Sequence, residues 1–166
     1  RSTTASFEPG SGATIQAYAG ICGTQDLQRN SDDYFHIRSL EEMTTFITNA
    51  GTGGSCDVET ATGNVAPVVT AASACTIPIN TPFELTGSAT DANGDSLTYT
   101  WEEYDLGAAT TAIPNTDASG GARPIFRSYK PTATGATRSF PSLPFILNNA
   151  NVPPSTFSGT NPVGTF

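Results

Sequence analysis

A glycine-rich stretch near the middle of the chain constrains the fold most. Glycines gather at positions 51, 53 and 54, and turn-forming residues continue to Asn64, which is typical of a linker over 51–64. The sequence has a helical pattern before this stretch and short alternating segments after it. It therefore predicts two units joined by the linker, over residues 1–50 and 65–166.

The first unit contains one strong helical pattern. Ser39 with Glu42 three residues later forms a capping-box pattern, and the residues Asn49, Ala50 and Gly51 supply a stop. Apolar side chains then fall on one face at helical spacing: Leu40, Met43, Phe46 and Ile47. One helix cannot bury a core alone, so this face needs a partner surface.

The second unit has the pattern of antiparallel strands. Leu97, Tyr99 and Trp101 alternate with polar residues, as expected for a half-buried strand. Further short strands are predicted around residues 67–69, 83–86, 125–129 and 145–147. Short strands separated by turns favour an immunoglobulin-like sandwich, incomplete because about five strands stand where roughly seven are needed. The antibody-type disulfide is excluded, since Cys75 is the unit's only cysteine.

Composition limits the classes of function. The formal charge is −8, with 15 acidic against 7 basic residues, so binding to nucleic acid or to anionic lipid is disfavoured. The apolar runs are too short to span a bilayer. Few charges and many turn-forming residues suit a secreted, β-rich protein. Of three cysteines, Cys22 and Cys56 are the first choice for a disulfide; alternatively Cys22 pairs with a residue upstream and the others are small apolar groups.

Three stretches carry a family resemblance. Residues 14–20 read Thr-Ile-Gln-Ala-Tyr-Ala-Gly within the longer stretch 10–23, and residues 27–36 and 39–43 follow. Together they resemble the end of the catalytic domain in bacterial secreted reprolysin-like zinc metallopeptidases, which are metzincins. Residues 91–101 look like the immunoglobulin-like or cadherin-like module that commonly follows in that family. The resemblance implies an α+β remnant of a metzincin catalytic domain over 1–50 and a mostly β sandwich over 65–166.

The resemblance also implies roles for particular residues. Gln16 stands where the family's turn under the zinc carries methionine, and a buried amide there would need hydrogen-bond partners. Tyr18 stands where some metzincins have a tyrosine that stabilises the oxyanion; alternatively it packs within the turn. His36, the only histidine, lies beyond the family's metal site and is expected to be structural. The zinc-binding helix is expected upstream of Arg1, which makes the chain an internal fragment without zinc ligands of its own.

Two acidic clusters remain. Asp91, Asn93 and Asp95 place oxygen ligands at alternating positions around Gly94, a spacing that suits calcium, although the EF-hand pattern is incomplete. The alternative is a polar hairpin turn, because Asn-Gly is a favoured hairpin dipeptide. The run over 102–105 is expected to lie solvated on an exposed strand face.

Two functions from different classes follow. The first is part of a secreted or cell-surface bacterial zinc endopeptidase, with a peptide or protein as the substrate of the intact parent. The second is a non-catalytic secreted adhesion or structural module that binds a partner or other copies of itself.

Overall fold

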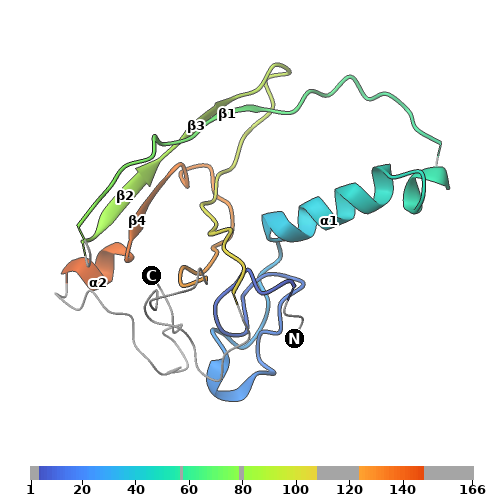
Figure 1. Ribbon diagram of the computed structural model, residues 1–166. Helices are drawn as coiled ribbons and strands as arrows, with labels where there is room; N and C mark the ends of the chain where they lie inside the picture. Colours follow the sequence, from blue (N-terminus) through green and yellow to red (C-terminus); the bar gives the residue numbers. More distant parts are fainter. Residues whose placement is uncertain (1–3, 57, 79–80, 108–123, 148–166) are drawn as a thin grey trace.

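The computed structural model describes residues 4–56, 58–78, 81–107 and 124–147 (Figure 1). The fold is α+β. Its long helix is α1 (Ile37–Thr48), and its strands are β1 (Val68–Thr70), β2 (Phe83–Thr86), β3 (Ser88–Thr90) and β4 (Thr137–Phe140). Three short helical turns complete the elements: η1 (Gly23–Gln25), η2 (Gly53–Ser55) and α2 (Leu143–Leu147). None of the helices in the described ranges is long and apolar enough to cross a membrane.

Helix α1 begins three residues earlier than the capping-box pattern predicts. His36 is the N-cap, and its Nδ1 accepts a hydrogen bond from the Arg38 amide at 3.2 Å. The prediction of Ser39 as the N-cap is therefore wrong. The acceptor for the helix amide is a histidine nitrogen instead of the serine hydroxyl. The predicted stop is confirmed, because Asn49 is the C-cap and donates its amide to the Thr45 carbonyl.

The apolar face of α1 is only partly covered within the described part of the chain, where Gly53 of η2 lies against the Phe46 ring. No residue of the helix is buried. Four of its apolar side chains are between two and three fifths exposed: Ile37, Leu40, Phe46 and Ile47. The described fold therefore does not supply the covering surface that the sequence predicts for this helix.

Two small antiparallel sheets form the second part of the fold. Strand β1 pairs with β3 from Val68↔Thr90 to Thr70↔Ser88, and β2 pairs with β4 from Phe83↔Phe140 to Thr86↔Thr137. The strands predicted around 67–69 and 83–86 are confirmed, whereas β4 was not predicted.

Other strand predictions fail or are met only in part. The 97–101 segment makes an isolated bridge between Tyr99 and Thr132 instead of a ladder. Residues 145–147 belong to the helical turn α2, so the strand predicted there is wrong. Neither a metzincin fold nor an immunoglobulin-like sandwich is identified among the described residues.

An aromatic cluster holds β2 and β4 together. Phe83 and Phe140 stack at 4.8 Å between ring centroids, and Phe126 meets both rings edge-on at 5.9 and 4.8 Å. Arg138 lies 4.5 Å over the Phe140 ring and 4.8 Å over the Tyr129 ring. Its guanidinium also donates to the carbonyls of Trp101 and Arg127, and burial lowers its pKa to about 10. The guanidinium thus ties the β4 strand to two neighbouring segments.

Residues from the two sides of the glycine-rich stretch contact one another directly. The Glu102 carboxylate accepts from the Ile37 amide at 2.7 Å and from the Ser128 hydroxyl at 2.6 Å. Arg127 donates to Gln28 at 2.5 Å, and the Lys130 ammonium lies 2.7 Å from the Asp33 carboxylate. The start of α1 is therefore held by residues from the second half.

The acidic run over 102–105 is solvated only in part: Asp105 is exposed as the sequence predicts, whereas Glu102 and Glu103 are not. The Glu102 side chain is only 8% exposed. Glu103 accepts hydrogen bonds from the amides of Ile125 and Phe126 at 2.8 and 2.7 Å. Burial raises the pKa of the Glu103 carboxyl to about 7, against the opposite effect of these two amides. Glu102 and Glu103 lie inward because backbone amides of other segments, at Ile37 and at 125–126, need hydrogen-bond acceptors.

Candidate functional site

The segment with the family resemblance folds as a tight, well-supported turn. The Ala17 amide donates to the Thr14 carbonyl at 3.0 Å, and the Tyr18 amide donates to the Ser11 carbonyl at 2.8 Å. The Ile15 amide donates to the Tyr34 carbonyl at 3.0 Å, which ties the turn to the chain before α1. These hydrogen bonds fix the backbone conformation of the turn.

Glu8 anchors the base of this turn. One carboxylate oxygen accepts from the amides of Ala13 at 2.9 Å and Thr14 at 3.2 Å, and the other accepts from the Thr14 hydroxyl at 2.7 Å. Ala13 and Thr14 are fully buried, so these donors have no access to water. An ionised carboxylate that satisfies three donors is a strong local support.

Glycines permit the tight path of the chain around the turn. Gly12 has φ +71° and Gly20 has φ +82°, in the left-handed region that favours glycine. A Cβ at Gly20 would collide with the carbonyl oxygen of Arg29. The turn and the 27–36 segment can therefore approach closely only because Gly20 lacks a side chain.

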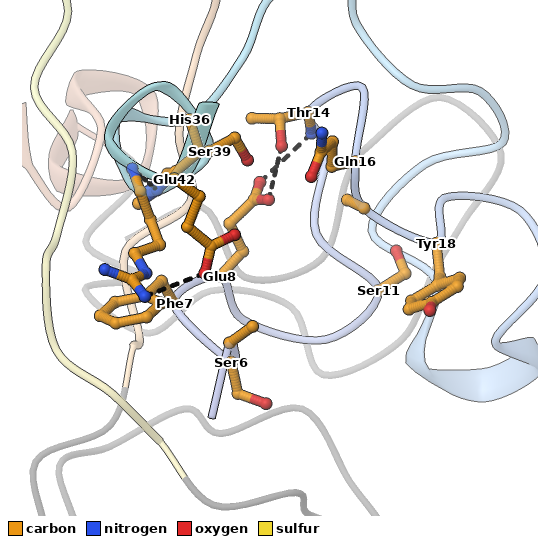
Figure 2. Close-up of a pocket in the computed structure, with 13 residues that line it drawn as sticks. Ser6, Phe7, Glu8, Ser11, Thr14, Gln16, Tyr18, His36, Ser39 and Glu42 are labelled. Carbon is orange, nitrogen blue, oxygen red and sulfur yellow. Dashed lines mark hydrogen bonds and ion pairs between the residues drawn. The ribbon is translucent and has the colours of Figure 1, made fainter. Parts of the chain in front are cut away.

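A pocket of about 240 Å³ opens beside the turn (Figure 2). Its lining comes from the N-terminal segment, the turn and the first turns of α1. The polar residues around it include Glu8, Gln16, Tyr18, His36, Arg38 and Glu42. The pocket therefore brings together residues that the sequence singled out separately.

One wall of the pocket is charged. Arg38 pairs with Glu42 at 2.9 Å and with Glu41 at 3.3 Å, and its guanidinium carbon lies 5.5 Å from the centroid of the Phe7 ring. The Tyr104 hydroxyl donates a short hydrogen bond to Glu41. Because each of these carboxylates has a partner, the wall does not present a bare charge.

His36 lies in this pocket as a structural residue. Its side chain is 4% exposed, Nδ1 caps α1, and Nε2 lies 4.0 Å from the Glu102 carboxylate. Tyr34 packs nearby with 8% exposure, and burial raises the pKa of its phenol, so the hydroxyl stays neutral. The geometry agrees with the predicted structural role of His36.

Gln16 and Tyr18 both face solvent at the pocket. Gln16 is exposed, so its amide does not carry the burial cost considered from the sequence. Tyr18 is 49% exposed, and its hydroxyl makes no hydrogen bond to another described residue. In Figure 2 its ring lies at the edge of the lining residues, apart from the hydrogen-bonded group around Glu8. The phenol is therefore accessible and is not packed inside the turn.

The cysteines are thiols in the structure. Cys22 lies beside the turn, where its Sγ contacts the Tyr18 carbonyl at 3.5 Å; Cys56 ends η2 and Cys75 is exposed. The pairing of Cys22 with Cys56 stays a prediction, to be checked by peptide mapping without reductant.

The described residues do not fit a zinc site. No group of three or more His, Cys, Asp or Glu side chains among them is arranged to hold a metal ion. The one histidine already uses Nδ1 for the helix cap. A catalytic zinc needs three protein ligands, so any zinc chemistry would require ligands from elsewhere.

The proposed calcium ligands form a turn in which two side-chain oxygens, one of Asp91 and one of Asn93, accept backbone hydrogen bonds. One Asp91 oxygen accepts from the amides of Asn93 at 2.8 Å and Asp95 at 3.1 Å. The Asn93 side-chain oxygen accepts from the Val65 amide at 2.8 Å, and Gly94 has φ +78°. This geometry fits the alternative of a polar turn, in which oxygen atoms serve the backbone. The three residues do not line the pocket beside the turn.

Sequence reasoning missed three residues of the pocket: Glu8, Arg38 and Phe7. Glu8 precedes Pro9 and Gly10, and that dipeptide signals a turn without naming its anchor. The Arg38 pairs have i,i+3 and i,i+4 spacing, which is a readable signal once the helix is placed correctly.

Comparisons of the chain with protein-family models, with curated proteins and with solved structures find no match. The site therefore rests on its own geometry and on the resemblance carried by its residues.

Proposed function

We propose that this chain is part of a secreted or cell-surface bacterial zinc endopeptidase. In this proposal residues 1–50 are the C-terminal part of a metzincin-type catalytic domain, and residues 65–166 belong to an immunoglobulin-like module. The observation that carries the proposal is the Thr14–Tyr18 turn, which presents Gln16 and Tyr18 together on the wall of a pocket. A turn beneath a catalytic metal needs this kind of rigid backbone and one accessible face.

The zinc in this proposal is held outside the described residues, because they provide no ligand set. When bound, zinc would polarise the scissile carbonyl and activate water. The contribution of this chain is a hydrogen bond from the Tyr18 phenol to negative charge that develops on the substrate oxygen. Half-exposure leaves the phenol free to turn toward such an oxygen.

The unburied apolar face of helix α1 is a second observation that supports the proposal. No residue of its apolar face is buried, and a groove beside it is lined by Ile37, Leu40 and Phe46 among others. A larger catalytic domain would supply the apolar surface that this face lacks.

The test uses the protein encoded with its upstream sequence. We expect an H-E-x-x-H helix there, bound zinc, and cleavage of a casein substrate. Tyr18→Phe should lower kcat by about tenfold to a hundredfold with little change in KM, because the hydroxyl acts only in the transition state. Gln16→Ala is the matched control on the same turn.

Absence of an upstream zinc motif, or a zinc-loaded protein whose Tyr18→Phe variant keeps full kcat, counts against the proposal. The first result would reject the proposal of a zinc peptidase, and the second would reject only the proposed role of Tyr18.

A second candidate function is a non-catalytic adhesion or structural module. The observation that favours it is the exposure of β1, whose three residues all face solvent. An accessible strand edge is a common site for strand addition from a partner.

A further inference from the structure

One continuous segment of the chain, residues 58–78, is exposed over its whole length. Val58 is 94% exposed, and Val68 and Val69 within β1 are each 69% exposed. Figure 1 shows the segment as an extended trace that leaves the region of α1 and runs along the outside of the fold into β1. This part of the covalent link between the two halves is therefore accessible from solvent.

Most backbone amides of this segment outside β1 have no hydrogen-bond acceptor among the described residues. The Asn64 amide donates to the Thr62 hydroxyl at 3.2 Å, and the Val65 amide donates to the Asn93 side chain at 2.8 Å. The amides of residues 58–63 and 72–77 donate to no described residue. Proteins that bind an extended peptide pair with free backbone groups of this kind, and exposed segments of small and polar residues are preferred sites of proteolytic cleavage. The segment can therefore enter a peptidase active site without local unfolding.

The side chains of the segment select the class of peptidase. Residues 39–122 contain no Lys or Arg, and residues 47–82 contain no Phe, Trp, Tyr, Leu or Met. A peptidase whose specificity pocket needs a basic or a large aromatic side chain therefore finds none in 58–78. Small aliphatic residues stand on both sides of β1, at Ala61, Val65 and Ala66 before the strand and at Ala71, Ala72 and Ala74 after it. Such side chains fit the small specificity pocket of an elastase-type enzyme.

We propose that residues 58–78 are a cleavage segment for an endopeptidase that recognises small aliphatic side chains, and that the cut chain persists as a two-fragment protein. Cleavage adds one water molecule across a peptide bond. The C–N bond breaks, the carbonyl carbon takes the hydroxyl to form a carboxylic acid, and the nitrogen takes the hydrogen to form an amine. The inference goes beyond both proposed functions and rests on neither.

The contacts that join the two halves lie outside this segment. Glu102 accepts from the Ile37 amide at 2.7 Å, and the rings of Phe7 and Tyr104 meet at 4.9 Å between centroids. In the intact chain the connecting segment keeps the two halves at a high effective concentration, whereas after the cut only non-covalent contacts hold them. The two-fragment protein is therefore a complex whose assembly depends on its concentration.

The position of the cut relative to β1 changes how firmly the fragments are joined. Strand β1 pairs with β3 from Val68↔Thr90 to Thr70↔Ser88. A cut before β1 leaves both strands on the second fragment. A cut after β1 leaves β1 on the first fragment, so its ladder with β3 is added to the contacts between the fragments. Fragments cut after β1 should therefore be held more tightly.

Helix α1 offers an exposed comparison within the same chain. Phe46 and Ile47 are 58% and 57% exposed, yet their backbone belongs to the helical hydrogen-bond ladder of Ile37–Thr48. A peptidase would have to unwind part of the helix in order to bind there. Exposure is therefore shared by α1 and the 58–78 segment, whereas an extended backbone with unpaired amides distinguishes the segment.

The first test is limited proteolysis of the native chain, with each cut located by fragment mass. Elastase should cut within 58–78. Ala61→Lys places a trypsin site in the segment, and Ile47→Lys places one on α1; both positions are exposed, so both variants should keep the far-UV CD of wild type. Trypsin should cut after position 61 at least about tenfold faster than after position 47, because only the helix must first unwind.

The second test follows the product that is cut once within 58–78. At about 100 µM, light scattering should give the mass of the uncut chain, and dilution should separate the fragments. In the cut protein, Glu102→Ala should raise the dissociation constant of the fragments at least about tenfold, because it removes the acceptor of Ile37. Glu84→Ala loses one exposed contact to Ser139 and should stay within about twofold of wild type.

Three results overturn the inference. Elastase that leaves every bond of 58–78 intact in the native protein rejects the cleavage segment, and so do equal trypsin rates after positions 47 and 61. A once-cut protein whose fragments separate at about 100 µM rejects the two-fragment product. The zinc motif expected upstream plays no part in these measurements, so the peptidase proposal stands or falls separately.

Discussion

At the residue scale, single glutamates decide the local structure of this chain more than its apolar residues do. Glu8 supports the turn, Glu102 holds the start of α1, and Glu103 holds the 125–126 backbone. Each of these carboxylates accepts two or more hydrogen bonds. An acidic protein with a small core can therefore use its carboxylates as internal acceptors.

Replacement of Glu8 should destabilise the fold strongly. Glu8→Ala leaves the buried donors of Ala13 and Thr14 without their acceptor, so the free energy of unfolding should fall by about 3 kcal/mol. Urea unfolding measures the loss. Glu59→Ala, at an exposed position, is the control and should change stability by less than about 0.5 kcal/mol. Equal stability of the two variants would show that Glu8 does not support the turn.

Glu103 should make stability depend on pH. The pKa of its carboxyl is about 7 in the folded protein against the ordinary 4.5, so the folded state binds more protons between these pH values. The stabilisation is full below pH 4.5 and is lost as pH rises through 7. With allowance for solvent screening, wild type should lose about 1–2 kcal/mol over this window.

Glu103→Gln keeps an oxygen for the amides of Ile125 and Phe126 and removes the titration. The variant should therefore lack this part of the pH dependence, as measured by urea unfolding at a series of pH values. Parallel pH profiles for the two proteins would refute the assignment.

The sequence predicted residue roles unevenly. The resemblance singled out Gln16 and Tyr18, and both line the same pocket, because residues two positions apart lie on one turn. Sequence reasoning missed Glu8, and it expected Glu102 and Glu103 in solvent because the donors that these two carboxylates satisfy lie far away in the sequence. Burial of a charge depends on its partner, which composition does not reveal.

At the element scale, α1 shows how a cap decides where a helix begins. Its apolar spacing and its end at Asn49 were readable from the sequence, whereas its start was not. Histidine is an uncommon cap, and Ser39 with Glu42 gave a stronger pattern. Strand β4 was missed because residues 130–142 read as turn, and its pairing with β2 comes from aromatic packing.

Variants of His36 should test the cap. His36→Ala removes the acceptor for the Arg38 amide and should cost about 1–2 kcal/mol with some loss of helical far-UV CD. His36→Asn restores a side-chain acceptor at the N-cap and should recover part of that loss. If both variants lose the same stability, packing of the imidazole matters and the cap does not.

The turn over 91–95 should be stable without calcium. Asp91→Ala removes the acceptor of two amides, so the unfolding midpoint should fall in the presence and in the absence of calcium. Thermal unfolding with and without calcium measures this, against a Glu59→Ala control at an exposed position. A calcium-dependent rise of the wild-type midpoint that is lost in Asp91→Ala would instead identify a calcium site.

At the scale of the whole molecule, the two halves predicted from the glycine-rich stretch are joined by direct contacts. Gly107 donates to the Ser6 carbonyl at 2.9 Å, and Arg127 and Lys130 reach Asp32 and Asp33. The Lys130 contact lowers the pKa of the Asp33 carboxyl. Composition can place a linker, but it cannot show that the segments on either side fold against each other.

The two halves should therefore unfold together. Far-UV CD follows α1 in the first half, and fluorescence follows Trp101 in the second; their urea transitions should coincide. Glu102→Ala should shift both by about 3 kcal/mol, because it leaves Ile37 and Ser128 without their acceptor. Glu84→Ala, which affects one exposed contact to Ser139, is the control.

Transitions that separate would show two independent units. A shift of only one probe in Glu102→Ala would show that this junction does not couple them.

The hydrogen bond from the Ile37 amide to Glu102 also sets an order for synthesis. The two residues are 65 positions apart, so the ribosome releases the whole of α1 well before its anchor exists. During that interval the exposed apolar face of the helix is available to chaperones. Folding of the nascent protein is therefore completed late. Only when the segment around Ser128 emerges can both oxygens of the Glu102 carboxylate accept their hydrogen bonds, one from Ile37 and one from Ser128.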